Sequence, residues 1–155
     1  MADFEIKIYG LDAYDGKLAR ITDQMPAETE RIMKKAVVYA QGQIPSYPAP
    51  PGGSSYRRTG TLGRVVTAFP GVAGGRSLGG GGGGGDGVPL TRVESIGGGV
   101  RGVIGGRLEY ITYVVGEGTQ ARTHAGRWWT LEKVIRGAKA GIIKVWRAGV
   151  IEMFK

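Results

Sequence analysis

Side chains able to do chemistry are few and far apart in this chain. It has a single histidine, His124, and no cysteine, and its acidic residues are scattered without a D-x-D pair. Catalytic and metal sites need several such groups converging on one point, and no H-x-x-x-H or H-E-x-x-H pattern is present. His124 lies in the polar stretch 123–127, so we expect a loop or interface histidine. The sequence predicts no enzyme, no metal and no cofactor.

Two glycine-containing stretches match nucleotide-binding motifs only in form. Gly97, Gly99 and Gly102 have the G-x-G-x-x-G spacing, but that motif needs a strand before it and a helix after it. Residues 100–104 predict a strand instead. The stretch 10–17 has the wrong spacing for a phosphate loop and lacks the Ser or Thr after its lysine. We reject both motifs.

Positive charge is the most distinctive chemical property of the chain, with a formal net charge of +8 and a pI of about 9.9. It favours an anionic partner, or a solvated basic surface. An amphipathic helix is predicted from Leu131 to Met153, with Thr130 as its N-cap. Four basic residues share the face opposite its apolar residues: Lys133, Arg136, Lys144 and Arg147. This face is either solvated or contacts DNA phosphates or an acidic protein.

The remaining periodicities predict a single α+β domain over residues 1–155. Residues 3–9 alternate apolar and charged side chains, as in a half-buried strand. A short helix over 11–21 precedes a longer one that begins at Asp23 or Pro26 and ends near Gln43. Further strands are expected at 62–69, 90–96, 100–104 and 110–115. The predicted architecture is an antiparallel sheet of about four to five strands, packed by the long helix and the C-terminal helix.

Two segments predict no regular structure of their own. Residues 70–89 should form a flexible loop, because eleven of the seventeen residues 71–87 are glycine, including the run 79–85. Residues 46–61 predict an extended arm, because prolines fix φ and remove donors. Aromatic and Arg side chains suit a protein interface, and we assign the arm and the tryptophans to a subunit or partner contact. The interface residues are Tyr47, Pro48, Pro50, Pro51, Tyr56, Arg57, Arg58, Trp128 and Trp129.

The order of these features resembles a known family. Gly10-Leu11-Asp12 opens a short helix, and Pro26 starts a long helix that contains alanines. The proline arm then leads through Arg58-Thr59-Gly60-Thr61-Leu62 into a strand. The segment 110–119, Tyr-Ile-Thr-Tyr-Val-Val-Gly-Glu-Gly-Thr, then leads to a basic loop and the last helix. This pattern resembles the tail-completion proteins (minor tail or head–tail connector proteins) of long-tailed bacteriophages, relatives of the lambda tail protein Z. The glycine run and Trp128-Trp129 depart from it.

The resemblance implies a structural role without catalytic residues. Such subunits form rings, usually of six, in the neck of the virion, where they join head-side connector proteins to the tail terminator or tail tube. Packaged DNA passes through the ring. We therefore expect a homo-oligomer located in the virion and assembled in the host cytoplasm. Tail-terminator and head-closure roles remain alternatives, as does a non-specific nucleic-acid-binding protein. No signal peptide is expected, and no apolar run approaches the ~20 residues of a membrane span.

Overall fold

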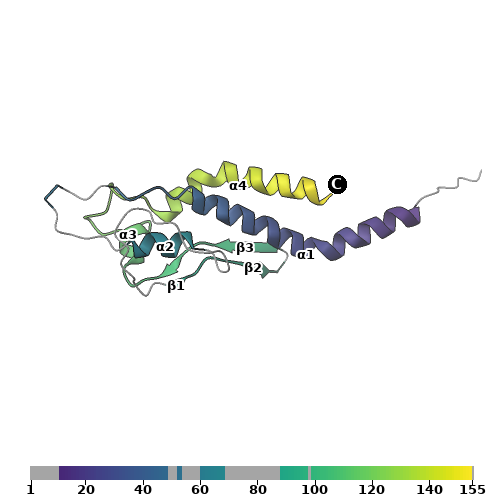
Figure 1. Cartoon of the computed structure of the whole chain (residues 1–155), viewed down its shortest axis with the longest axis horizontal. Helices are drawn as coiled ribbons and strands as arrows, with labels where there is room; N and C mark the ends of the chain where they lie inside the picture. The colour runs from purple at the N-terminus through teal and green to yellow at the C-terminus, as the bar shows by residue number, and fades with distance from the viewer. Residues whose placement is uncertain (1–10, 49–51, 54–59, 69–87, 98, 155) are drawn as a thin grey trace, which may run out of the picture.

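The computed structural model describes residues 11–48, 52–53, 60–68, 88–97 and 99–154, and it is α+β as expected (Figure 1). Four helices accompany four short strands in this part of the chain. In chain order they are α1 (Leu11–Gly42), α2 (Thr61–Thr67), β1 (Val88–Pro89), β2 (Arg92–Ile96), β3 (Gly99–Val103), β4 (Gly106–Arg107), α3 (Ile111–Val115) and α4 (Leu131–Met153). The strand predicted at 3–9 lies outside the described residues, as does most of the glycine-rich loop.

Helix α1 corrects the prediction of two separate helices. It runs without a break for 32 residues with Pro26 inside it, and Figure 1 shows it bending part-way along its length. Proline removes one backbone donor and usually kinks a helix without having to end it. The Thr29 hydroxyl donates to the carbonyl oxygens of Met25 (2.8 Å) and Pro26 (2.9 Å), next to this proline. The predicted end near Gln43 is confirmed, because α1 ends at Gly42.

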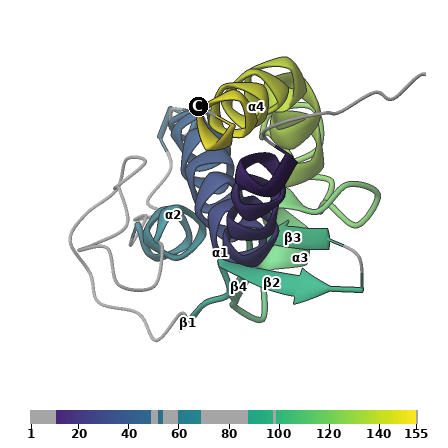
Figure 2. The ribbon, with the colours of Figure 1, turned by 90° about the vertical axis from the view of Figure 1, so that its right-hand side faces the viewer.

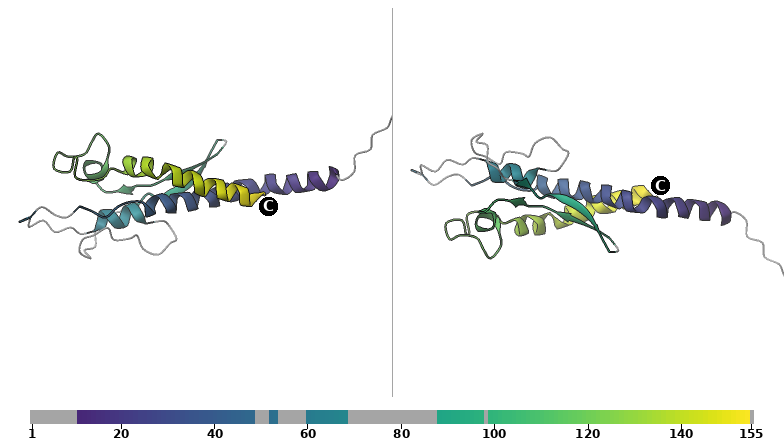
Figure 3. Two further views of the ribbon diagram at one scale, coloured as in Figure 1. Left: turned by 90° about the horizontal axis from the view of Figure 1, so that it is seen from above. Right: turned by 90° about the horizontal axis from the view of Figure 1, so that it is seen from below.

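Helices α1 and α4 pack antiparallel, as Figures 2 and 3 show. The direction follows from two glycines of α4: Gly141 lies against the ring of Tyr39, and Gly149 lies against Ile32. A Cβ on Gly149 would come within 2.6 Å of Ile32 Cγ1, so the absent side chain is what allows the close approach of the two helices. The predicted N-cap is also confirmed, because Thr130 Oγ1 accepts the backbone N–H of Lys133 at 3.3 Å.

The single sheet of four to five strands was a wrong prediction. The described strands form two separate antiparallel ladders, β1 with β4 and β2 with β3. Strands β2 and β3 correspond to the strands predicted at 90–96 and 100–104 and form a hairpin, with Ile96 paired to Gly99 and Arg92 paired to Val103. The hairpin packs on α1 at Gly102, where an added Cβ would meet Val37 and come within 3.1 Å of Met33 Sδ. Residues 88–89, which were assigned to the loop, form β1.

Two segments predicted as strands are helices. Residues 62–69 correspond to α2, and 110–115 correspond to α3. Both segments have apolar residues at i, i+3 and i+4. In so short a run, this spacing is compatible with the buried face of a helix as well as with a buried strand. Gly60, at φ 74°, turns the chain into α2. At the end of α3, the Gln120 side chain donates to the Val114 carbonyl at 2.7 Å, which satisfies a helix-terminal acceptor.

The main core cluster lies at one end of the molecule, where α1, α2, α3 and the start of α4 meet. Its buried members are Ile44, Leu62, Val66, Val114 and Val115. Beside it, the buried amide of Gln41 donates to the carbonyls of Val66 (3.0 Å) and Ala68 (3.1 Å) and to Thr91 Oγ1 (3.1 Å). This side chain therefore ties α1 to both α2 and the strand region.

Candidate assembly interface

Three of the predicted interface residues meet one another inside the chain, at the base of the arm. The Tyr47 ring stacks on Trp129, with centroids 6.1 Å apart and an interplanar angle of 7°, and lies 5.1 Å from the Trp128 ring. The rings of Trp128 and His124 form a T-shaped pair with centroids 4.9 Å apart. All four side chains are half-buried. His124 is therefore a packing partner of an aromatic cluster, in keeping with the expected loop histidine.

Both ends of the arm are anchored in the same core. Tyr47 packs against the cluster that contains Leu62, and Gly60 and Thr61 are buried where the arm returns to α2. The described residues on either side of the arm, Tyr47 and Pro48 before it and Gly60 and Thr61 after it, therefore lie in the same part of the molecule. The predicted contact residues Pro50, Pro51, Tyr56, Arg57 and Arg58 lie outside the described residues. Their assignment to an interface stays a prediction.

The basic face of α4 is exposed along its whole length. Lys133, Arg136, Lys144 and Arg147 are all exposed, and Lys139 adds a further cation beside them. Arg136 Nη2 lies 2.7 Å from the Glu117 carboxylate. Within the part of the chain described, Lys133, Lys144 and Arg147 form no ion pair. From Lys133 to Arg147 the helix rises ~21 Å, so these charges form a line able to face an extended anionic surface.

A second charged site lies on the hairpin, where sequence reasoning had singled out nothing. Glu94 Oε2 accepts from Arg92 Nε at 3.0 Å, and Glu94 Oε1 accepts from Arg101 Nε at 2.6 Å. The hydrogen bond from Arg92, followed by that from Arg101, lowers the pKa of the Glu94 carboxyl below its usual 4.5. The Glu94–Arg101 pair could have been predicted from the sequence, because a hairpin with a two-residue turn places Glu94 opposite Arg101.

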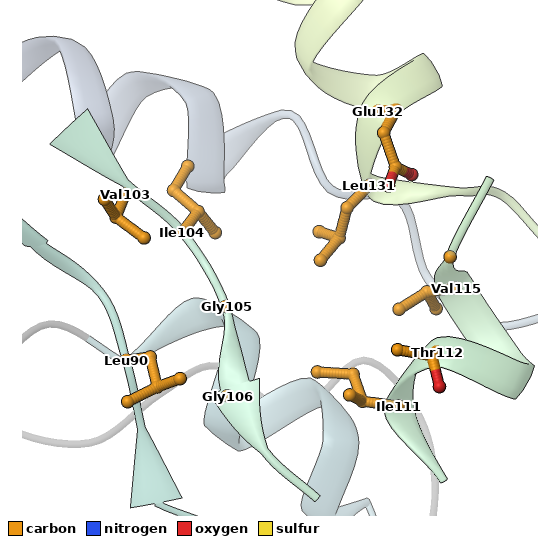
Figure 4. Close-up of a pocket in the computed structure, with 11 residues that line it drawn as sticks. Leu90, Val103, Ile104, Gly105, Gly106, Ile111, Thr112, Val115, Leu131 and Glu132 are labelled. Carbon is orange, nitrogen blue, oxygen red and sulfur yellow. The ribbon is translucent and has the colours of Figure 1, made fainter. Parts of the chain in front are cut away.

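An apolar groove of about 280 Å³ lies between the β1–β4 ladder, α3 and the start of α4 (Figure 4). Its large side chains are Leu90, Val103, Ile104, Ile111, Val115 and Leu131. Glu132 is the one ionisable residue of the lining, and its carboxylate accepts the backbone N–H of Glu117 at 3.1 Å. A groove of this composition can receive an apolar side chain but offers no set of groups for acid–base chemistry. The sequence did not reveal it, because its walls come from element ends far apart in the chain.

Two other kinds of site are absent from the described part of the chain. No group of three or more His, Cys, Asp or Glu side chains is placed to hold a metal ion. None of the described helices is long and apolar enough to cross a membrane.

Comparisons with protein-family models, with curated proteins and with solved structures find no match to this chain.

Proposed function

We propose that the protein is a structural subunit of a bacteriophage neck, a tail-completion protein that works as a homo-oligomeric ring. The observation that carries the proposal is the projection of α1 beyond the rest of the fold. Residues 22–27 are all exposed, although they are consecutive and so point to every side of the helix. A helix exposed on all sides is stabilised by no tertiary contact, and an isolated helix of ~12–15 residues is only marginally stable in water.

The extent of the projection follows from the packing of α4. Gly149 lies against Ile32, and α4 ends at Met153, only four residues later. Because the two helices run antiparallel, α4 ends near the level of residue 28 on α1. About seventeen residues of α1, or ~25 Å, extend past it, as Figures 1 and 3 show. Met25 in this part is 42% exposed. A helix of this kind is suited to packing against another subunit.

The proposed ring needs two different surfaces that match, because ring subunits meet head to tail. The projecting half of α1 lies at one end of the elongated molecule. The described ends of the arm, residues 46–48 and 60–61, and the apolar groove lie at the other end, near the main core cluster. Surfaces at opposite ends of one subunit can bind in sequence from copy to copy. The basic face of α4 would then meet an acidic neighbouring protein or the DNA that passes through the ring.

The test is the mass of the purified protein in solution, measured by light scattering and by negative-stain electron microscopy. We expect closed rings of one size, with six subunits as the expected number. The matched variant replaces Tyr56, Arg57 and Arg58 by serine and keeps Tyr47, because Tyr47 contributes to the core. It should remain helical by circular dichroism but fail to form rings. A wild-type chain that stays monomeric at all concentrations contradicts the proposal.

A non-specific nucleic-acid-binding protein is the second candidate, favoured by the exposed basic face of α4. The salt dependence of binding to duplex DNA should show how many phosphates the basic face contacts. If Lys133, Arg136, Lys144 and Arg147 each contact one phosphate, a plot of the logarithm of the association constant against the logarithm of the salt concentration should have a slope of about −3.6. Changing Lys144 and Arg147 to glutamine should reduce the slope by about 2. Lys34→Gln is the control, because Lys34 pairs with Glu30 on α1 at 2.7 Å. Absence of binding at low salt removes this candidate.

A further inference from the structure

The β2–β3 hairpin has two free edges in the described structure. Each strand has one neighbour only, so the outer backbone groups of β2 and of β3 face no other described strand. Open edges of this kind readily pair with a strand from another chain. The hairpin also has two distinct faces. Val93 and Val100 are half-buried on the face that carries Gly102 against α1, and the Arg92, Glu94 and Arg101 cluster lies on the other face.

The sequence of residues 3–9 has the same two-sided pattern. Phe4, Ile6 and Ile8 alternate with Asp3, Glu5 and Lys7. Added at a hairpin edge, the apolar set would extend the face formed by Val93 and Val100. The charged set would extend the face of the Glu94 cluster. The charges also complement one another, because two Arg and one Glu on the hairpin leave one positive charge, and Asp3, Glu5 and Lys7 leave one negative charge.

The middle of the segment 3–9 cannot reach the level of Gly102 in its own subunit. Gly102 lies against Met33 and Val37, and Met33 is 22 residues along α1 from Leu11, or ~33 Å. The chain from Ile6 to Leu11 has five residue steps and spans at most ~18 Å. Figure 1 shows the N-terminal half of α1 running away from the hairpin. Pairing along the hairpin therefore requires a second copy.

We propose that residues 3–9 of one subunit pair, as a third strand, with the free edge of the β2–β3 hairpin of the neighbouring subunit. The inference rests on the proposed function, since a ring supplies the neighbour. It gives the projecting half of α1 a purpose: the helix carries the N-terminal segment ~25 Å beyond the body, to where the next subunit lies. The contact is heterologous, as a ring requires.

The test uses cysteine crosslinking, for which the chain is suited because it has no cysteine of its own. A chain with Lys7→Cys is mixed, unfolded and reassembled with a chain carrying either Arg92→Cys on β2 or Arg101→Cys on β3. Both partner positions lie on the charged face. We expect an intermolecular disulfide with at least one of them under mild oxidation. Lys139→Cys, exposed on α4, is the matched control and should give none.

A second measurement keeps the test independent of the cysteines. Ile6→Ser should reduce the ring fraction measured by light scattering, whereas Lys7→Ser, on the opposite face of the same segment, should leave it nearly unchanged. The inference is wrong if rings form but neither hairpin position crosslinks, or if both serine variants assemble equally; the neck-ring proposal then still stands. A wild-type chain that forms no ring removes both proposals. The pairing between subunits is also contradicted if a chain that carries Lys7→Cys together with Arg92→Cys or Arg101→Cys forms the disulfide within a single monomer.

Discussion

The close contact between α4 and α1 at Gly149 allows a quantitative prediction. Gly149 is buried, and an added Cβ would lie 2.6, 2.9 and 3.0 Å from Cγ1, Cγ2 and Cδ1 of Ile32, which is itself 0% exposed. Two of these atoms are attached directly to the Ile32 Cβ, so the side chain cannot move its far end alone out of the way. Overpacking of this kind costs ~1–3 kcal/mol. Alanine in place of glycine within a helix recovers ~1 kcal/mol.

Gly149→Ala should therefore lower the free energy of unfolding by ~0–2 kcal/mol. Gly137→Ala is the matched control, because Gly137 lies in the same helix, is exposed, and has nothing within 4 Å of an added Cβ. It should raise the free energy of unfolding by up to ~1 kcal/mol. Both variants gain the same helix propensity from the change of glycine to alanine. The difference between their free energies of unfolding, ~1–3 kcal/mol, therefore measures the overpacking alone.

The assay is urea denaturation followed by circular dichroism at one protein concentration, since assembly also shifts apparent stability. In an Ile32→Ala background the contact atoms are gone, and Gly149→Ala should become as stabilising as Gly137→Ala. The reasoning is refuted if Gly149→Ala stabilises the wild-type chain as much as Gly137→Ala does. The α1–α4 register would then differ from the one described.

Three further predictions concern single side chains. Gln41→Met should destabilise the fold by ~1–3 kcal/mol, because the buried carbonyl of Val66 and the part-buried carbonyl of Ala68 lose a donor. Gln43→Met, at an exposed position, should have little effect in the same denaturation assay. Thr130→Ala should cost ~1 kcal/mol through loss of the α4 N-cap, and Thr130→Ser should restore most of it; equal stability of both would contradict the capping role. The Glu94 carboxyl, followed by NMR titration, should have a pKa below 4.5, and Arg101→Gln should raise it. Because the pKa of Glu94 is lower in the folded state, this carboxylate stabilises the fold at pH values above its unfolded pKa. That contribution is lost as the pH falls through the folded-state pKa. The free energy of unfolding of the Glu94→Gln variant should therefore depend less on pH in this acidic range.

The helical part of the fold could be predicted because its signals are long. Helix α4 has a capping threonine and an apolar face that repeats over 23 residues, and its bounds agree with the prediction. The end of α1 was predicted from Pro45, because a proline disfavours the helical conformation at the residue before it. In both cases many residues agree on one periodicity, so single exceptions do not change the outcome.

The short elements could not be predicted because tertiary contacts decide them. The apolar residues of α2 and α3 fit a strand or a helix equally well, and the Gln120 side chain that caps α3 comes from outside it. Pro26 has the features of a helix start, yet the local hydrogen bonds of Thr29 accompany a continuous helix. The same limit applies to the site: the basic face of α4 follows from periodicity, whereas the apolar groove depends on how α3 and α4 are placed.

The proposed neck role depends on assembly more than on any single residue. Cryo-electron microscopy of the purified full-length protein is the most direct test. We expect class averages of a closed ring with an open lumen, in which the projecting half of α1 in each subunit contacts the next copy. A protein that remains a monomer on the grid and in solution, with residues 22–27 of α1 exposed on every side, would contradict the account.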